Sequence, residues 1–131
     1  MDCNICGTVL IIPEGIKKIC FTDICGYIHK NQIEEIFLPS TLEVIEAYTF
    51  YDFTEVKRIN VPSSVTKIGS ESFFGLDSLK ELCIPLTVER VEKYTFCNLP
   101  ECKLVISGKC QEIPSGWDRE FAANVKEICF A

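Results

Sequence analysis

Apolar residues recur along the chain at fixed distances from four prolines, Pro13, Pro39, Pro62 and Pro85. The last three prolines are 23 residues apart, and the first gap is 26 residues. One apolar column lies directly before the proline, four lie three, six, eleven and fourteen residues after it, and two more close the unit. The columns are, in that order, Ile12, Leu38, Val61, Ile84; Ile16, Leu42, Val65, Val88; Ile19, Ile45, Ile68, Val91; Ile24, Phe50, Phe73, Phe96; Tyr27, Phe53, Leu76, Leu99; Ile33, Val56, Leu79, Cys102; and Ile36, Ile59, Leu82, Val105.

The first repeat is three residues longer than the others. Its extra residues lie in the stretch "GYIHKNQ" (26–32), between two columns, where a loop can absorb them. A fixed internal period of 20–50 residues is typical of a solenoid, in which each repeat forms one coil of a continuous stack. A single repeat cannot bury its apolar face, so the repeats are expected to be stable only as an array.

The spacing within a repeat also predicts its local structure. "VKRINVP" (56–62) reads as a short strand, and its proline ends the ladder because it has no N–H to donate. "SSVTKIG" (63–69) reads as a second short strand. The columns eleven and fourteen residues after the proline are three apart, which suits one turn of α- or 3₁₀-helix. We therefore expect parallel strands in adjacent coils and the rings of Phe50, Phe73 and Phe96 directly over one another.

These columns resemble the BspA-like leucine-rich repeats. The resemblance rests on "VKRINVPSSVTKIGSESFFGL" (56–76) and "LKELCIPLTVERVEKYTF" (79–96), with "GTVLIIPEGIKKI" (7–19) similar to a first repeat. The segment "IPSGWDREFAANVKEICF" (113–130), which holds the only tryptophan, resembles the part that closes such arrays.

The resemblance implies an α/β leucine-rich-repeat solenoid: a β-rich, right-handed coil of about five repeats of ~23 residues with parallel strands and short helical or 3₁₀ turns. It also implies a role in binding proteins or cell-surface components, and it supplies no catalytic residues. We expect a single domain over 1–131, with an N-terminal cap (1–10), the repeats (11–107) and a closing segment (108–131).

A ligand is expected on the outward positions of the first strand, two and four residues before each proline. Neighbouring strands lie ~4.8 Å apart, so Glu35, Arg58 and Glu81 are predicted to form an alternating charge row with Phe37 among them. The same register would place Leu104 and Ile106 outward. The candidate binding residues are Ile11, Glu35, Phe37, Arg58, Asn60, Glu81 and Cys83.

The function expected from this face is that of a non-enzymatic module that binds a protein or surface ligand. One alternative is that the charge row is satisfied within the chain and its apolar neighbours are incidental, since exposed ion pairs contribute little. A second alternative is a structural or self-assembling repeat unit, so a homo-oligomer is possible. A weaker one is a thiol or zinc protein that uses Cys3 and Cys6, although no second C-x-x-C pair completes a four-ligand site.

Charge and composition exclude several functions. A net charge of −6, with no basic cluster larger than a pair, argues against nucleic acid. The longest strongly apolar run, Val9–Ile12, is far shorter than a membrane span. No basic leader opens the sequence, which predicts a cytoplasmic protein, or a surface or secreted one if a signal segment has been removed. No cofactor or metal is expected.

Nine cysteines and one histidine remain. Without an export signal the thiols are expected to be free. Cys25 and Cys97 share a column three repeats apart, roughly 14 Å at the strand spacing, which is too far for a disulfide. Cys102 replaces a core leucine, and His29 lies in the inserted loop with no orienting partner nearby in sequence. None of the common nucleotide-binding, metalloprotease or hydrolase motifs occurs, so an enzyme is not expected.

Overall fold

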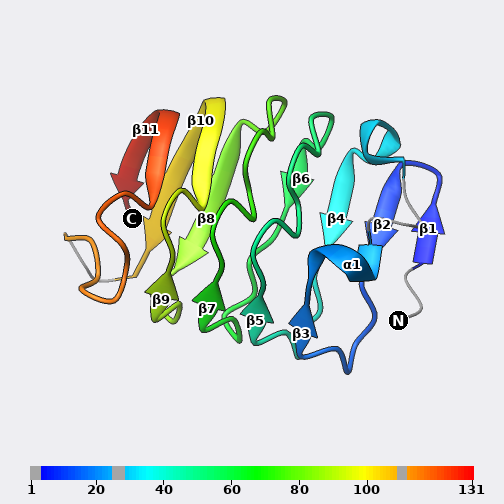
Figure 1. Cartoon of the computed structure of the whole chain (residues 1–131), viewed down its shortest axis with the longest axis horizontal. Coiled ribbons are helices and arrows are strands. Elements are labelled where there is room, and N and C mark those ends of the chain that lie inside the picture. The colour runs from blue at the N-terminus through cyan, green and yellow to red at the C-terminus, as the bar shows by residue number, and fades with distance from the viewer. Residues whose placement is uncertain (1–3, 25–28, 109–111) are drawn as a thin grey trace.

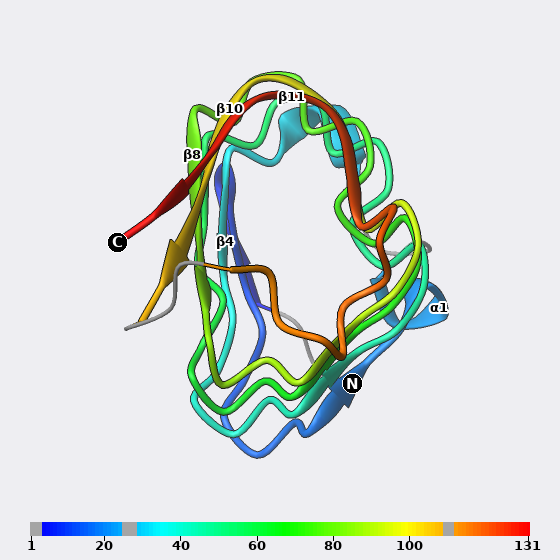
Figure 2. The same cartoon turned by 90° about the vertical axis from the view of Figure 1, so that its left-hand side faces the viewer.

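Successive turns of the chain stack along one axis, and equivalent parts of neighbouring repeats lie side by side (Figure 1). Seen along that axis, the coils superpose into a ring (Figure 2). The computed structural model describes residues 4–24, 29–108 and 112–131. This architecture confirms the predicted parallel-strand solenoid of about five coils.

The first strand of each coil lies on one side of the ring, and in the last two coils it is the final part of a longer strand that curves over from the turn side (Figure 2). Its members are β2 (Val9–Ile11), β4 (Glu35–Phe37), β6 (Arg58–Ile59), β8 (Glu81–Pro85), β10 (Phe96–Ser107) and β11 (Ala122–Phe130). They form two parallel sheets, because β2, β4 and β6 are joined in one ladder and β8, β10 and β11 in another, without a ladder between β6 and β8. A short strand β1 (Asn4–Cys6) pairs antiparallel with β2 and starts the stack.

The second strand of each coil contributes to a four-stranded parallel sheet. Its members are β3 (Lys18–Ile19), β5 (Val44–Ile45), β7 (Lys67–Ile68) and β9 (Arg90–Val91). In each of these strands the second residue is buried, which places the predicted column of Ile19, Ile45, Ile68 and Val91 in the core. Val91 forms one further bridge to Trp117, so the closing segment continues the row.

The third side of the ring is made mainly of turns rather than helix. Among the described residues, helix is limited to α1 (Phe21–Ile24) and the 3₁₀ turn η1 (Lys30–Gln32) in the inserted loop. In the second coil Tyr48 and Asp52 adopt left-handed backbone angles (φ +63° and +59°), and a right-handed helix cannot contain them. The predicted helical turn is therefore replaced there by two tight bends around Phe50.

The apolar spine runs through all the coils. Phe50, Phe73 and Phe96 are fully buried, and their ring centroids are 5.5 and 5.4 Å apart along the stack. Phe121 of the closing segment meets Phe96 edge-on at 6.4 Å. The predicted stack of three phenylalanines is confirmed.

A column of hydroxyl residues directly before these phenylalanines is buried as well. Thr49, Ser72 and Thr95 are inaccessible to solvent. Thr95 Oγ1 donates to the carbonyl oxygens of Glu92 and Gly69 at 2.8 and 3.0 Å, and Ser72 Oγ donates to Gly69 at 2.8 Å. These bonds satisfy carbonyl groups that the turn leaves without a ladder partner.

The predicted register of the fifth coil is wrong by one residue. Leu104 pairs with Leu82 and Ile106 with Ile84, and both are buried, whereas the prediction placed them outward. Lys103 and Val105 pair instead with the outward residues Glu81 and Cys83, although Val105, predicted in a core column, is only 9% exposed. The reason is that this coil is one residue shorter: Lys103 pairs with Glu81, 22 positions earlier, and no proline follows Ile106 to mark the shift.

The described cysteines are all free, as predicted: Cys6, Cys20, Cys83, Cys97, Cys102 and Cys129. Cys97 and Cys102 are buried, and Cys102 fills its core column as a small apolar side chain. Cys3, Cys25 and Cys110, together with the predicted core residue Tyr27, lie outside the described residues.

Candidate ligand-binding face

The outward side of the first strands, from β2 to β8, carries the predicted binding residues; we call it the first-strand face. Ile11 and Phe37 are register partners on β2 and β4, and they remain 38% and 50% exposed. Each is flanked in sequence by two buried residues, because successive side chains of a strand point to opposite sides of the sheet. The two coils thus present one continuous apolar step to solvent.

The predicted charge row is only partly formed. Glu35 and Arg58 are register partners, and Arg58 Nη2 lies 3.9 Å from Glu35 Oε1. The Arg58 side chain is 79% exposed, so most of its guanidinium donors face water. Within the described part of the chain, no ion pair joins Arg58 to Glu81, since β6 and β8 belong to separate sheets.

Asn60 has a structural task on this face. Its side-chain amide accepts from the backbone N–H of Leu38 at 2.9 Å and donates to the Leu38 carbonyl oxygen at 3.2 Å. The amide therefore replaces a pair of ladder hydrogen bonds just beyond the end of β6. Asn60 holds the second and third coils together. Its amide is hydrogen-bonded to Leu38 and is not free to bind a ligand.

A shallow hollow of about 260 Å³ lies between β4, β6 and β8. Its lining consists of Ile36, Phe37, Lys57, Arg58, Ile59, Asn60 and Glu81. Four of the predicted residues are thus brought together, with Glu35 joined to them through Arg58. Ile11 lies beside Phe37 on the next strand, and Cys83 follows Glu81 along β8.

Three of the described thiols, Cys83, Cys97 and Cys102, have raised pKa values. Partial burial, the Glu81 charge and a 3.8 Å hydrogen bond to Glu81 raise the pKa of Cys83. Burial likewise raises the pKa of Cys97, and it raises that of Cys102 to about 12. Raised thiol pKa values favour the protonated form, whereas nucleophiles and metal ligands need the thiolate.

The zinc alternative rests on residues at the edge of the described chain. Cys6 is exposed, whereas Cys3 lies outside the described residues. Across residues 4–24, 29–108 and 112–131, no group of three potential metal-ligating His, Cys, Asp or Glu residues comes together.

A second candidate surface, on the turn side of the coils, was not predicted. Phe21, Tyr48 and Tyr51, with Lys30 and Asp52, line a largely apolar hollow of about 500 Å³. Lys30 Nζ lies 5.0 Å from the centroid of the Phe21 ring and donates to the Tyr51 carbonyl oxygen at 2.8 Å. We call these five residues the aromatic hollow.

Aromatic residues at fixed distances after the prolines indicate the aromatic hollow in the sequence. Tyr51 and Phe74 both lie twelve residues after a proline, and their rings stack at 4.9 Å with planes 7° apart. Tyr48 lies nine residues after Pro39. The predicted ligand site comprised only outward positions of the first strand and therefore did not include these two columns.

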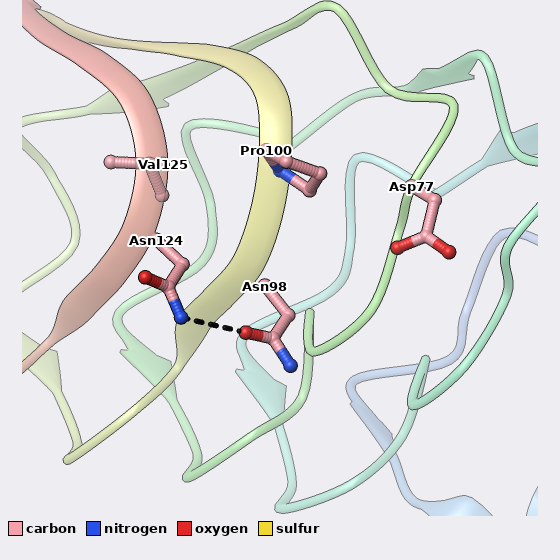
Figure 3. A pocket seen from close by; sticks show the side chains of 5 residues that line it. All are labelled: Asp77, Asn98, Pro100, Asn124 and Val125. Atoms are coloured by element: carbon pink, nitrogen blue, oxygen red, sulfur yellow. Dashed lines mark hydrogen bonds between the residues drawn. The ribbon is translucent and has the colours of Figure 1, made fainter.

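A third hollow, of about 480 Å³, lies where the last two coils bend (Figure 3). Asp77, Asn98, Pro100, Asn124 and Val125 line it. Asn124 Nδ2 donates to Asn98 Oδ1 at 3.0 Å, and both residues adopt left-handed backbone angles (φ +56° and +54°). Asparagine tolerates this conformation better than most residues. We therefore interpret the hydrogen-bonded pair of asparagines as a support for the bend.

The family of the chain follows from its repeats. The family described as a BspA type leucine-rich repeat region matches residues 16–117, in six copies. The chain belongs to the BspA-type leucine-rich repeat family. Membership of this family indicates a general role as a protein-interaction repeat module. The exposed apolar and charged residues of the first-strand face agree with that role.

A solved structure supports the fold of this BspA-type chain. A leucine-rich cell surface protein from Faecalibacterium prausnitzii A2-165 superposes with a TM-score of 0.73 over 95% of the chain, at 19% sequence identity. The match covers 32% of that protein, so the present chain spans about a third of its length. Such a low identity establishes the shared fold alone. A search of curated proteins found no match.

Among the helices in the described ranges of this BspA-type chain, none has the length and apolarity needed to cross a bilayer.

Proposed function

We propose that the chain is a non-enzymatic interaction module that binds an extended protein segment through its first-strand face. The observation that carries the proposal is the hollow between β4, β6 and β8, where the half-exposed ring of Phe37 adjoins the exposed guanidinium of Arg58. Aromatic and arginine side chains dominate the binding energy of protein interfaces. The membership of the BspA-type family supports the general role.

The chemistry of the face indicates what such a segment would contain. Ile11 and Phe37 provide an apolar step for an aliphatic or aromatic side chain. Arg58 Nη2 lies 3.9 Å from Glu35 Oε1 on one side of the guanidinium. The solvent-facing side of the guanidinium can bind a carboxylate of the ligand. We therefore expect ligands in which an apolar residue lies close to an acidic one.

A random-peptide display selection against the immobilised chain tests this function. Selected peptides are synthesised and titrated against the wild type and against the double variant Phe37→Asp, Arg58→Glu. The proposal expects an apolar–acidic motif in the selected peptides and at least a tenfold weaker affinity for the double variant. Circular dichroism and gel filtration of each variant establish that the coil has folded.

The matched control makes the same two exchanges elsewhere on the chain. Phe21→Asp, Arg119→Glu alters the aromatic hollow and the exposed closing segment and leaves β4 and β6 untouched. Binding that survives in this control and is lost in the first variant supports the first-strand face. The reverse pattern would overturn the proposal and move the site to the aromatic hollow.

The cellular address is part of the same proposal. The structural neighbour is described as a cell surface protein, which favours the surface alternative over the cytoplasmic one for the present chain. Antibody labelling of intact and permeabilised cells distinguishes the two. Labelling of intact cells supports a surface location, and labelling after permeabilisation alone supports the cytoplasm.

A further inference from the structure

The aromatic hollow lies on the turn side of the coils, away from the first-strand face. In the view along the stack, α1, which carries Phe21, lies on the opposite side of the ring from β4 (Figure 2). Lys30 comes from η1, and Tyr48, Tyr51 and Asp52 come from the turn of the second coil. Only the first repeat contains the inserted stretch 26–32, so Lys30 has no counterpart in the other repeats. The hollow therefore occurs at one place in the stack rather than in every coil.

Exposed aromatic rings form most of its wall. Tyr48 and Phe21 are 46% and 37% exposed. The ring of Tyr51 is covered on one face by Phe74, at 4.9 Å, and its centroid lies 5.9 Å from that of Tyr48, with the two planes 60° apart. The space that these rings border measures about 500 Å³, which is within the range of ~300–1,000 Å³ typical of small-molecule sites.

Lys30 adds a hydrogen-bond donor to this wall. Its Nζ lies 5.0 Å from the centroid of the Phe21 ring and 5.8 Å from that of Tyr51. One N–H is donated to the Tyr51 carbonyl oxygen at 2.8 Å, and an ammonium group has three such donors. In the described part of the chain, no carboxylate lies within ion-pair distance of this ammonium. Lys30 therefore keeps donors for a ligand in the hollow.

Asp52 adds an acceptor. The residue is exposed, and among the described residues its carboxylate has no ion-pair or hydrogen-bond partner. A Cβ at Gly75 of the next coil would lie 2.5 Å from Asp52 Oδ1, so the glycine leaves the room in which this carboxylate lies. The hollow thus combines aromatic surface with one cationic donor and one anionic acceptor.

This combination of groups indicates the class of ligand. A cationic ligand would be repelled by Lys30, and an anionic ligand would be repelled by Asp52. A purely apolar ligand would cover both charged groups without giving them hydrogen bonds, which costs free energy. A sugar ring is compatible with all of them. Its C–H groups carry a partial positive charge and pack on ring faces, which are negative, and its hydroxyl groups both donate and accept hydrogen bonds.

We propose that the aromatic hollow binds a pyranose ring of a carbohydrate. The exposed ring of Tyr48 packs against the C–H face of the sugar, Lys30 donates to one hydroxyl group, and the Asp52 carboxylate accepts from another. The Tyr48 hydroxyl has a different partner: its hydrogen bond to the Glu71 carboxylate raises the pKa of Tyr48. Only the ring of Tyr48 is therefore assigned to the ligand.

Titration of the nitrogen-15-labelled 131-residue chain with free oligosaccharides, followed by two-dimensional NMR, tests the site. The panel consists of maltotriose, cellotriose, mannotriose, galactotriose, xylotriose and chitotriose, with benzoate and indole as anionic and apolar probes. Each is added to about 10 mM, so that a Kd in the millimolar range is detected. The wild type is expected to bind at least one oligosaccharide, with shifts at Tyr48 and Asp52. Binding of benzoate or indole alone, or of nothing in the panel, would overturn the proposal.

Tyr48→Leu and Tyr94→Leu form a matched pair. Both tyrosines lie nine residues after a proline, have left-handed backbone angles (φ +63° and +59°) and are exposed, but Tyr94 does not line the hollow. Leucine keeps apolar bulk and removes the flat ring, so Tyr48→Leu is expected to weaken binding of the selected oligosaccharide by about tenfold. Tyr94→Leu and Tyr48→Phe should bind it like the wild type.

Unchanged affinity in Tyr48→Leu, or an equal loss in Tyr94→Leu, would contradict the proposal. Circular dichroism establishes that each variant has folded. If Tyr48→Leu does not fold, Asp52→Gly replaces it, because glycine adopts the φ of +59° readily. This variant lacks the acceptor and should bind several-fold more weakly, and full affinity would exclude the assigned role of Asp52. Peptide binding at the first-strand face is measured separately on the same variants and should not change, so each proposal can fail alone.

Discussion

The rings of Phe73 and Phe96 lie in neighbouring coils with centroids 5.4 Å apart and planes 28° from parallel. Phe50 lies on the other side of Phe73, at 5.5 Å, and all three rings are fully buried. Phe73 therefore contacts aromatic rings in two other coils, and it couples three repeats in a fold where each coil contacts only its neighbours.

Truncating this central ring is expected to be among the most damaging core substitutions. Phe73→Ala should lower the free energy of unfolding by about 3–5 kcal/mol, because it removes buried apolar surface and leaves a cavity between coils. Urea denaturation followed by circular dichroism measures the loss. Phe73→Leu, which keeps much of the volume, should lose less and provides a folded reference if the alanine variant is too unstable.

The next residue provides the control. Phe74 is only partly buried, and its ring stacks on Tyr51 at the surface. Phe74→Ala removes the same number of atoms from a position that water can fill, so its loss should be clearly smaller. Equal losses at the two positions would mean that the spine of phenylalanines does not set the stability of the array.

The core could be predicted from sequence because its information is repeated. Phe50, Phe73 and Phe96 occupy one column, and each repeat confirms the register of the others. The fifth coil lacked this redundancy, since no proline follows Ile106 and one residue is missing between Glu81 and Lys103. A slip of one residue in a strand exchanges its two faces, which is why Leu104 and Ile106 were placed outward.

The binding features were less predictable because they depend on how coils meet. Glu81 appeared to continue the charge row of Glu35 and Arg58, yet the ladder stops between β6 and β8. No pattern of residue types encodes that interruption. The left-handed bends were partly readable, since Asp52, Gly75 and Asn98 share a column and have positive φ angles. Tyr48 also has a positive φ angle, but a tyrosine does not predict a left-handed backbone.

Gly69 is required by the close approach of two coils. A Cβ at this position would lie 2.5 Å from the backbone nitrogen of Ala47 and 2.9 Å from its Cα. Because these are backbone atoms of the adjacent coil, they cannot move aside without separating the coils. Gly69→Ala should therefore destabilise the fold by about 1–3 kcal/mol, the usual range for overpacking.

Thermal and urea unfolding of Gly69→Ala and Ser70→Ala measures this effect. Ser70 is the next residue and is partly exposed, so its substitution should change stability by about 0.5 kcal/mol or less. A neutral Gly69→Ala would show that the spacing between the second and third coils is adjustable.

Trp117 anchors the closing segment. Its indole Nε1 donates to the Val88 carbonyl oxygen at 2.9 Å, and the residue is 4% exposed. Trp117→Phe keeps the apolar ring but removes the donor, which should lower stability by about 1–3 kcal/mol because the buried carbonyl loses its partner. Denaturation followed by circular dichroism checks the loss, and a variant as stable as the wild type would show that the hydrogen bond contributes nothing.

The described cysteines differ in solvent accessibility, which predicts the order in which they react. Cys6 and Cys83 are exposed, whereas Cys97 and Cys102 are buried. Under native, reducing conditions N-ethylmaleimide should modify Cys6 and Cys83 first, and should reach Cys97 and Cys102 only as the coils open. Peptide mass spectrometry after timed quenching gives the order. Early modification of Cys102 would contradict its place in the core.

The thiol of Cys102 also makes stability depend on pH. Burial, followed by the Glu81 charge, raises the pKa of Cys102 from 9.0 to about 12 in the folded chain. Between those values the unfolded state releases a proton that the folded state retains, so the free energy of unfolding falls as pH rises. Below pH 9 both states hold the proton and the contribution no longer varies.

Comparison with Cys102→Val isolates this dependence. Valine is apolar, fills a similar space and cannot ionise, while the tyrosines and lysines that titrate in the same range are common to both proteins. The difference in unfolding free energy between wild type and variant should be constant up to about pH 9 and should then shift in favour of the variant as pH approaches 12. Parallel stability curves through that interval would mean that the Cys102 thiol ionises equally in the folded and unfolded chains, which its burial in the core makes unfavourable.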